Sequence, residues 1–167
     1  MITSYFMKTI LYIFFLSFLF TSSASADFKL GVDAYIANDY VTAYKELKPF
    51  AEQGNADAQQ KLGYMYVTGQ GVTQDYKEAA KWFRLAAHQG NVHAHYNLGW
   101  LYWQGKGVIK NYVLSHMWFN IAAINGDQEA EKARAALEIQ IKSKEKIARA
   151  KELARECIEN HYKNCRL

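Results

Sequence analysis

The stretch from Asp39 to Lys110 contains one pattern twice, and this repetition decides the fold. Asp39-Tyr40-Val41-Thr42-Ala43 returns as Asp75-Tyr76-Lys77-Glu78-Ala79, at an offset of 36 residues. The same offset joins three further pairs of segments: Gln53-Gly54-Asn55 with Gln89-Gly90-Asn91, Leu62-Gly63 with Leu98-Gly99, and Gly69-x-Gly71-Val72 with Gly105-x-Gly107-Val108. A third copy begins at Asn111-Tyr112 and keeps Trp118-Phe119 before it drifts. A fixed period of this length is typical of stacked helical repeats.

Each period predicts two helices. From Tyr76 to Ala87 apolar residues recur at three and four positions, which places one apolar stripe along a helix. Gly90 ends this helix and Asn91 caps the next, because glycine accepts the left-handed conformation and the Asn side chain satisfies free amides. Gly105-x-Gly107 ends the second helix. One pair has too little core of its own, so neighbouring pairs must stack.

The pattern resembles the Sel1-like repeat family, which is related to the tetratricopeptide repeats. The resemblance covers roughly Asp27 to Ala136 and implies an all-α fold, a right-handed α-solenoid of antiparallel helix pairs that works by holding other proteins. Its residues are Ala58-x-x-x-Leu62-Gly63-x-x-Tyr66-x-x-Gly69-x-Gly71-Val72-x-x-Asp75-Tyr76-x-x-Ala79-x-x-Trp82-Phe83-x-x-Ala86-Ala87-x-x-Gly90 and a second copy from Ala94 to Gly126.

The chain of 167 residues is predicted to contain one domain behind a cleaved leader. Residues 1–26 carry Lys8, an apolar run from Ile10 to Phe20, and small residues before Asp27, which is the pattern of a signal peptide. The apolar run is shorter than the about 20 residues that cross a bilayer. We therefore expect export to the periplasm or beyond, with no stable membrane anchor after cleavage.

The mature chain is expected to have two parts. Residues 27–141 would form the solenoid, with a half-repeat at 27–54, repeats near 55–90 and 91–126, and a degenerate third repeat from 127. Its last helix would run to about Ile141, because Ala135 and Ala136 replace Gly63 and Tyr64 and no Gly-x-Gly loop follows. Residues 142–167 would form a C-terminal capping helix and a tail, because repeat arrays need their open ends covered.

Charge is unevenly distributed along the chain. Residues 27–131 hold nine Lys or Arg against eleven Asp or Glu, whereas residues 132–167 hold ten against five. In the tail the acidic residues alternate with the basic ones at helical spacing, which indicates a solvated helix face with ion pairs. No nucleic-acid-binding motif is present, so no nucleic-acid partner is predicted. We expect a monomer whose ligand is a protein or peptide.

Two cysteines, Cys157 and Cys165, both lie in the tail. A lone pair usually bonds in an oxidising compartment. On one continuous helix their separation would be about 12 Å, so a disulfide requires the chain to reverse, and Asn160 and Asn164 favour a turn. Secreted cysteine-rich Sel1 relatives use the same Cys-x7-Cys spacing to clamp helices, so the resemblance favours a Cys157–Cys165 disulfide. The alternatives are two free thiols, or a metal site completed by His161.

No metal, cofactor or catalytic site is predicted. His93 and His95 point to different sides of a helix, and the other histidines have no partner at ligand spacing, so we interpret them as surface or groove residues, although the sequence around His116 favours packing. The segment from Ser143 to Lys146 matches the Ser-x-x-Lys of penicillin-recognising enzymes, but neither Ser-Asp-Asn nor Lys-Thr-Gly occurs. Ser143 is therefore interpreted as a helix cap.

The candidate binding residues come from an overlay on tetratricopeptide repeats, in which the helix matching the Leu-Gly helix lines the concave side. The inward positions carry an aromatic surface rather than a charged clamp, and Asn97 takes the place of an asparagine that often hydrogen-bonds a bound peptide backbone. Groove and core positions both remain open for Tyr64, Trp100 and Trp103. The predicted binding residues are Tyr35, Tyr64, Tyr96, Asn97, Trp100 and Trp103.

The sequence therefore predicts a non-enzymatic, exported scaffold or adaptor that presents a concave helical surface to another protein. The first alternative is a module that binds cell-wall peptidoglycan, since aromatic platforms also serve there. A penicillin-binding or β-lactamase-like enzyme is the last alternative.

Overall fold

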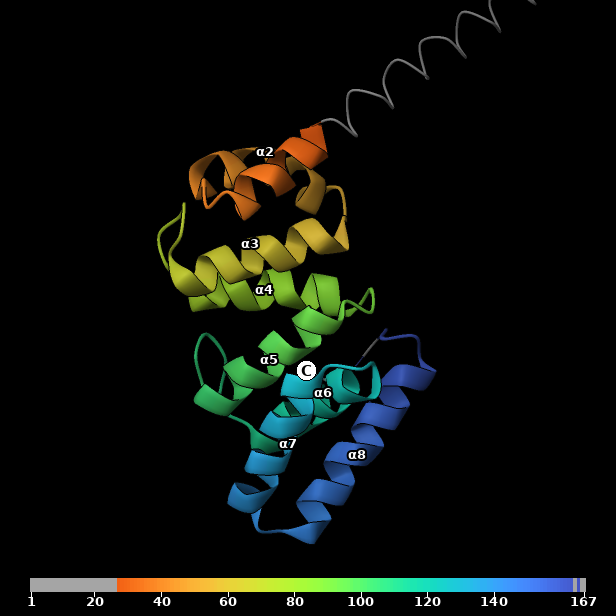
Figure 1. Cartoon of the computed structure of the whole chain (residues 1–167). Helices are drawn as coiled ribbons and strands as arrows, with labels where there is room; N and C mark the ends of the chain where they lie inside the picture. The colour runs from red at the N-terminus through yellow and green to blue at the C-terminus, as the bar shows by residue number, and fades with distance from the viewer. Residues whose placement is uncertain (1–26, 164, 166–167) are drawn as a thin grey trace, which may run out of the picture.

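The computed structural model describes residues 27–163 and 165, and in this part of the chain every regular element is a helix (Figure 1). The predicted signal peptide and Asn164 lie outside the described residues. A helical segment over 27–36 comes first. It is followed by α2 (Tyr40–Glu52), α3 (Ala56–Thr68), α4 (Tyr76–Ala87), α5 (Val92–Gln104), α6 (Tyr112–Ile124), α7 (Gln128–Ile141) and α8 (Lys144–Glu159). The predicted all-α helical-repeat solenoid is confirmed.

The repeated sequence produces repeated helix ends. The Asn55 side chain accepts a hydrogen bond from the amide of Ala58 at the start of α3, and Asn91 does the same for Ala94 at the start of α5, both at 2.9 Å. At the other ends Gly69 and Gly105 adopt the left-handed conformation, with φ of 72° and 71°. Glycine reaches this conformation without strain, and its amide then satisfies a free carbonyl of the last turn.

The two helices of each repeat pack closely because one carries a glycine where the other carries a phenylalanine. A Cβ atom on Gly63 would lie 2.6 Å from the Phe83 ring, and one on Gly99 would lie 2.5 Å from the Phe119 ring. Both phenylalanines are fully buried. The Leu-Gly pairs thus let α3 pack on α4 and α5 pack on α6, and neighbouring repeats join through the α4 and α5 contact.

The last two helices do not repeat this arrangement. Helix α7 ends at Ile141 and Ser143 caps α8, as predicted: the Ser143 hydroxyl oxygen accepts from the amide of Lys146 at 3.2 Å. Helix α8, however, packs on α6 and hardly touches α7. It therefore closes the stack as an end cover of α6 rather than as the partner of α7.

The Gly-x-Gly loops dock on the start of the preceding repeat's second helix. A Cβ on Gly71 would lie 2.4 Å from the Tyr40 carbonyl oxygen, and one on Gly107 would lie 2.1 Å from that of Tyr76. Both glycines have positive φ. These loops thereby bring the tyrosines at the starts of α2 and α4 beside the following repeat. Among the described residues, no helix combines the length and apolarity needed to cross a membrane.

Candidate functional site

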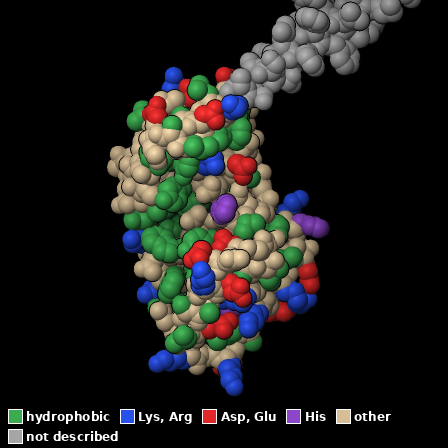
Figure 2. Space-filling view, in the orientation of Figure 1, with side chains coloured by type: hydrophobic (Ala, Val, Ile, Leu, Met, Phe, Trp, Pro, Cys, Tyr) green, Lys and Arg blue, Asp and Glu red, His purple; other side chains and the backbone are tan. Residues whose placement is uncertain are grey.

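Four of the predicted binding residues form the surface that we call the aromatic face: Tyr35, Tyr64, Trp100 and Trp103. All four side chains are partly solvent-exposed, and Tyr64 is the most open at 39%. Tyr64 and Trp100 occupy equivalent positions of α3 and α5, one repeat apart. Figure 2 shows hydrophobic side chains gathered in a band across the helices on one side of the molecule. The structure thus leaves these aromatic side chains accessible.

At the N-terminal end of the aromatic face, Tyr35 is ordered by its neighbours. Its ring meets the Tyr40 ring edge to face at a centroid distance of 5.5 Å, and the Lys61 ammonium lies 5.2 Å from its centroid. Burial raises the pKa of the Tyr35 hydroxyl to about 12, and nearby Tyr64 and Tyr40 add to the shift. The hydroxyl is therefore neutral, and a hydrogen-bond donor, throughout the physiological pH range.

Trp100 lies in a small cluster with one tyrosine and one lysine. Its ring is 6.4 Å from the Tyr76 ring, and the Lys106 ammonium lies 5.0 Å from Trp100 and 4.8 Å from Tyr76. Lys106 also donates a hydrogen bond to the Tyr76 hydroxyl at 3.3 Å. Such contacts between a cation and aromatic rings hold the lysine in place at a modest gain of about 0.5 to 1 kcal/mol each.

Trp103 contacts both of the next two helices, α6 and α7. Its indole nitrogen donates to the side-chain oxygen of Gln140 at 2.9 Å, and its ring meets Phe119 edge to face at 6.0 Å. Trp103 is thus part core residue and part surface residue, which accounts for the ambiguity of its sequence pattern.

Tyr96 lies one turn before Trp100 on α5 and packs against the same core cluster as Trp100 and Trp103, and Asn97 follows it. Tyr96, in the first half of α5, lines an open pocket of about 630 Å³ with Val92, His93 and the first residues of α7. Burial raises its pKa, helped by the nearby carboxylates of Asp127 and Glu129. Asn97 donates its side-chain amide to the His93 carbonyl at 2.8 Å, one turn back in the same helix.

Sequence reasoning missed the lysines and Tyr76 beside the aromatic face. Lys61 and Lys106 lie over its rings, and Lys110 lies 5.1 Å from the centroid of Tyr112. A signal was available, because Tyr40, Tyr76 and Tyr112 recur at the repeat period and begin α2, α4 and α6. The lysines had no comparable signal, since their positions in the repeat differ.

His95 contradicts the prediction of a surface or groove residue, whereas His116 is packed, as the sequence around it favours. His95 and His116 are fully buried. The Nε2 atom of His95 donates a hydrogen bond to the Ala87 carbonyl at 3.0 Å. Gln59 makes the equivalent bond one repeat earlier, where its side-chain amide donates to the Ala51 carbonyl at 2.9 Å. Burial lowers the pKa of His95 to about 4. The hydrogen bond to Ala87 opposes this shift, and the nearby His88 adds to it. The residue is therefore a neutral core donor, a role that its place in the repeat decides.

His116 makes a second buried contact. Its Nε2 lies 2.7 Å from a carboxylate oxygen of Glu138 on α7. Burial lowers the pKa of His116 although Glu138 opposes the shift, and the hydrogen bond in turn lowers the pKa of Glu138. A neutral imidazole that donates to an ionised carboxylate fits both directions. In residues 27–163 and 165, no group of three His, Cys, Asp or Glu side chains could hold a metal ion.

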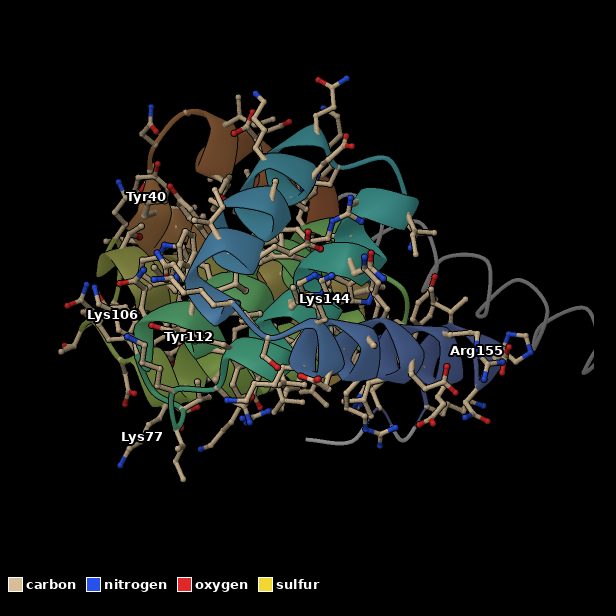
Figure 3. All side chains as sticks on the ribbon, turned by 90° about the horizontal axis from the view of Figure 1, so that it is seen from below. Tyr40, Lys77, Lys106, Tyr112, Lys144 and Arg155 are labelled. Atoms are coloured by element: carbon tan, nitrogen blue, oxygen red, sulfur yellow. A yellow bond between two sulfur atoms is a disulfide. The ribbon has the colours of Figure 1, made fainter. Side chains whose placement is uncertain are left out.

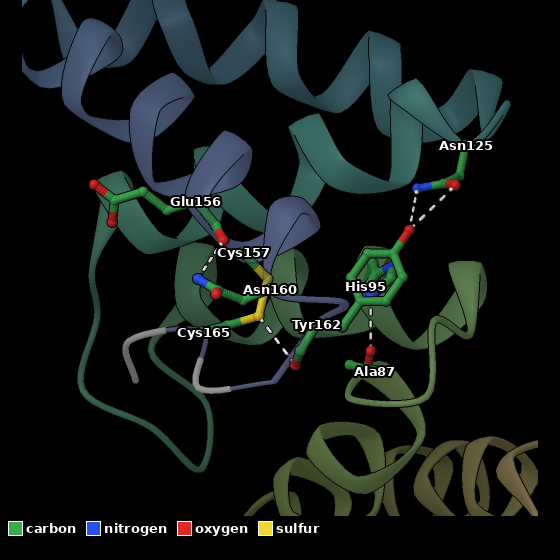
Figure 4. Close-up of a disulfide and its surroundings, with 8 residues drawn as sticks. All are labelled: Ala87, His95, Asn125, Glu156, Cys157, Asn160, Tyr162 and Cys165. Carbon is green, nitrogen blue, oxygen red and sulfur yellow. Dashed lines mark hydrogen bonds between the residues drawn. A yellow bond between two sulfur atoms is a disulfide. The ribbon is translucent and has the colours of Figure 1, made fainter.

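A disulfide joins Cys157 to Cys165 (Figure 4). The chain reverses after α8, where His161 and Tyr162 adopt positive φ. This turn places the Tyr162 ring 5.0 Å from the His95 ring, with its hydroxyl 3.3 Å from the Asn125 amide nitrogen. The disulfide therefore holds an aromatic cover over the buried histidine, and neither free thiols nor a thiolate metal site is present.

Comparison with known proteins now decides the family. The model of the Sel1 repeat matches residues 56–91 and 92–127. The chain is a Sel1-repeat protein. No curated protein matches it.

Two solved structures share the fold. A protective antigen present in uropathogenic Escherichia coli strains, which displays an SLR fold, superimposes with a TM-score of 0.77 at 29% identity over 85% of this chain. A Sel1 repeat protein from Oxalobacter formigenes gives a TM-score of 0.63 at 34% identity over 68% of this chain. The Sel1-repeat protein described here spans 31% and 46% of those two chains.

The family bears on the predicted role at a coarse level. The Sel1 repeat fold is a scaffold for protein–protein interaction and is typically non-catalytic. Ser143, the one serine with an enzyme-like sequence context, has its hydroxyl engaged at the exposed start of α8, where it donates to Glu145 at 2.8 Å. Its oxygen also accepts from the Lys146 amide, which makes Ser143 a helix cap.

Proposed function

We propose that this Sel1-repeat protein is an exported adaptor that binds a segment of another protein on its aromatic face. The observation that carries the proposal is the partial exposure of Tyr64 and Trp100 at equivalent positions of two stacked repeats. Tyr and Trp are favoured interface anchors, because they bury a large area at a low cost in side-chain entropy.

Export is proposed on separate grounds. The disulfide between Cys157 and Cys165 supports it, because such bonds persist in oxidising compartments and are rare in reducing ones. Sequencing the N-terminus of the protein purified from its source would test it. A mature chain beginning at Asp27 supports the proposal, whereas a chain that keeps residues 1–26 in the cytoplasm contradicts it.

The adaptor role is tested by crosslinking the protein in its native envelope and identifying the captured proteins by mass spectrometry. The test variants are Tyr64→Ala and Trp100→Ala, and the matched control is Leu85→Ala, on α4, whose side chain is 48% exposed. We expect at least one captured protein to be lost from both test variants and kept by the control. Circular dichroism of each variant separates loss of binding from loss of folding.

An unchanged capture list for folded variants would contradict the proposal. Retention of the wild-type protein on purified cell wall, lost in the same two variants, would instead favour peptidoglycan as the ligand of the aromatic face.

A further inference from the structure

The lysines beside the aromatic face differ from the other lysines of the repeats. Within the described residues of 27–131, Lys29, Lys45, Lys48 and Lys81 each lie within 4.0 Å of a carboxylate oxygen. No such partner lies near the remaining lysines of this range, which we call the lysine edge: Lys61, Lys77, Lys106 and Lys110. Three of these four lysines lie over aromatic rings.

The lysine edge follows one side of the molecule. Figure 3 shows Lys77 and Lys106 at the same edge as Tyr40 and Tyr112, where the Gly-x-Gly loops meet the starts of the second helices. In Figure 2, some Lys or Arg side chains lie at the outer side of the hydrophobic band, and side chains of both charges lie across it. The aromatic face therefore has a positively charged border.

Neighbouring carboxylates are held at the helix starts by capping bonds and form no ion pair with the lysine edge. Asp39 accepts from the amide of Thr42 at 3.2 Å, and Asp75 accepts from the amides of Lys77 and Glu78 at 2.8 and 3.1 Å. Glu78 pairs with Lys81. The acidic groups closest in sequence to Tyr40 and Tyr76 thus point their oxygens at the backbone.

Three of these lysines are positioned by rings and keep hydrogen-bond donors available. Lys61, Lys106 and Lys110 lie 4.8 to 5.2 Å from the ring centroids that they cover. Each ammonium has three N–H donors, and Lys106 uses one of them for the Tyr76 hydroxyl. An ordered cation with free donors beside exposed aromatic rings fits a ligand that supplies carboxylates and apolar groups together.

We propose that the aromatic face binds an extended acidic segment of another protein, in which Asp or Glu residues alternate with apolar residues. The inference rests on the proposed adaptor function and adds the chemistry of the ligand. In an extended chain successive side chains point to opposite sides, so the carboxylates would meet the lysine edge while the apolar side chains pack on Tyr64 and Trp100. The charges would speed association and select the ligand, and the rings would supply most of the affinity.

The test uses three short synthetic peptides of equal length in which Leu alternates with Glu, Gln or Lys. Binding is followed by tryptophan fluorescence of the full mature chain. We expect the Glu peptide to bind most tightly, the Gln peptide more weakly and the Lys peptide least. The affinity for the Glu peptide should fall as salt rises, because exposed charges are screened.

Variants identify the lysines responsible. Lys61→Gln and Lys106→Gln should each lower the affinity for the Glu peptide by about fivefold and leave the affinity for the Gln peptide unchanged. The matched control is Lys48→Gln, since Lys48 also lies over a tyrosine ring but has Glu52 at 4.0 Å. The control should bind the Glu peptide as the wild type does.

Three results would overturn the inference. They are equal affinity for the Glu and Gln peptides, no binding of the Glu peptide at millimolar concentration, and concentration-dependent dimers lost in Trp100→Ala, which would make a second copy the occupant. The adaptor proposal is judged separately by the crosslinking capture: a Tyr64- and Trp100-dependent partner without any preference for Glu leaves that proposal standing and removes this one.

Discussion

The two matching repeats and the terminal helix pair solve the same packing problem differently. In α3–α4 and α5–α6 a glycine on the first helix receives a buried phenylalanine from the second. In the terminal pair Arg134 and Ala135 stand where the repeats have Leu-Gly, and α8 leaves α7 to pack on α6. Arg134 instead donates to Asn120 at 2.6 Å. The loss of one small residue coincides with the loss of the close helix pair.

The terminal pair compensates with covalent and local contacts. The Cys157–Cys165 disulfide closes the tail, and Tyr162 then contacts His95 and Asn125 of two other helices. Gly90 also contributes, since a Cβ there would lie 3.0 Å from the Tyr162 ring. Packing thus holds the repeats together. The end of the chain is held by the disulfide and the Tyr162 contacts, which we call the clasp. Three experiments test this contrast.

The largest effect is expected from removing the clasp. Cys157→Ser with Cys165→Ser should lower the free energy of unfolding of the α8 region by about 2.5 kcal/mol, the loop-entropy value for a sequence separation of 8 residues. Hydrogen exchange should show lost protection in α8 and near-native protection in α3 and α4. Equal loss of protection throughout the solenoid would show that the clasp and the repeats unfold as one unit.

The next effect is a pH dependence of stability that distinguishes the repeat with His95 from the repeat with Gln59. The pKa of His95 falls from 6.5 to about 4 on folding, so the unfolded chain binds more protons between these values and His95 destabilises the fold as pH drops from 7 to 5. The loss should be about 2 kcal/mol at pH 5. Urea unfolding at both pH values measures it.

His95→Gln is the variant that tests this assignment, because Gln59 makes the equivalent hydrogen bond in the preceding repeat. The variant should keep the contact with the Ala87 carbonyl and lose about 2 kcal/mol of the pH dependence. The reverse change, Gln59→His, should add pH dependence to the first repeat. A His95→Gln protein with the wild-type difference between pH 7 and pH 5 would assign that difference to other groups.

The smallest effect tests the glycine itself. Gly63→Ala should lower the free energy of unfolding by about 1 to 2 kcal/mol, because overpacking against Phe83 costs more than the gain in helix propensity. Thermal or urea unfolding measures the change. Ala135→Gly in α7 is the counterpart, where no such contact exists and only the propensity loss of about 1 kcal/mol should appear. A stabilised Gly63→Ala protein would show that the tight fit is dispensable.

Much of the fold was predictable because it repeats. The stretch from Asp39 to Lys110 contains the same pattern twice, and this repetition indicated the helix ends at Asn55, Asn91, Gly69 and Gly105. These ends could be predicted because capping depends only on nearby residues. The exposure of Tyr64 and the tie between Trp103 and Gln140 were not predictable, because they depend on which later helix covers each ring. The burial of His95 was missed for the same reason.

By itself the sequence determined the all-α repeat architecture, the boundaries of most helices and the presence of an aromatic set on the Leu-Gly helices. Local backbone preferences and a fixed period suffice for these features, since the structure of each repeat depends mainly on its own residues. Only the tertiary structure decided that α8 packs on α6, that Tyr162 covers His95, and that Lys61 and Lys106 lie over aromatic rings from other segments. Those outcomes depend on contacts between residues far apart in the chain, and no local pattern encodes them.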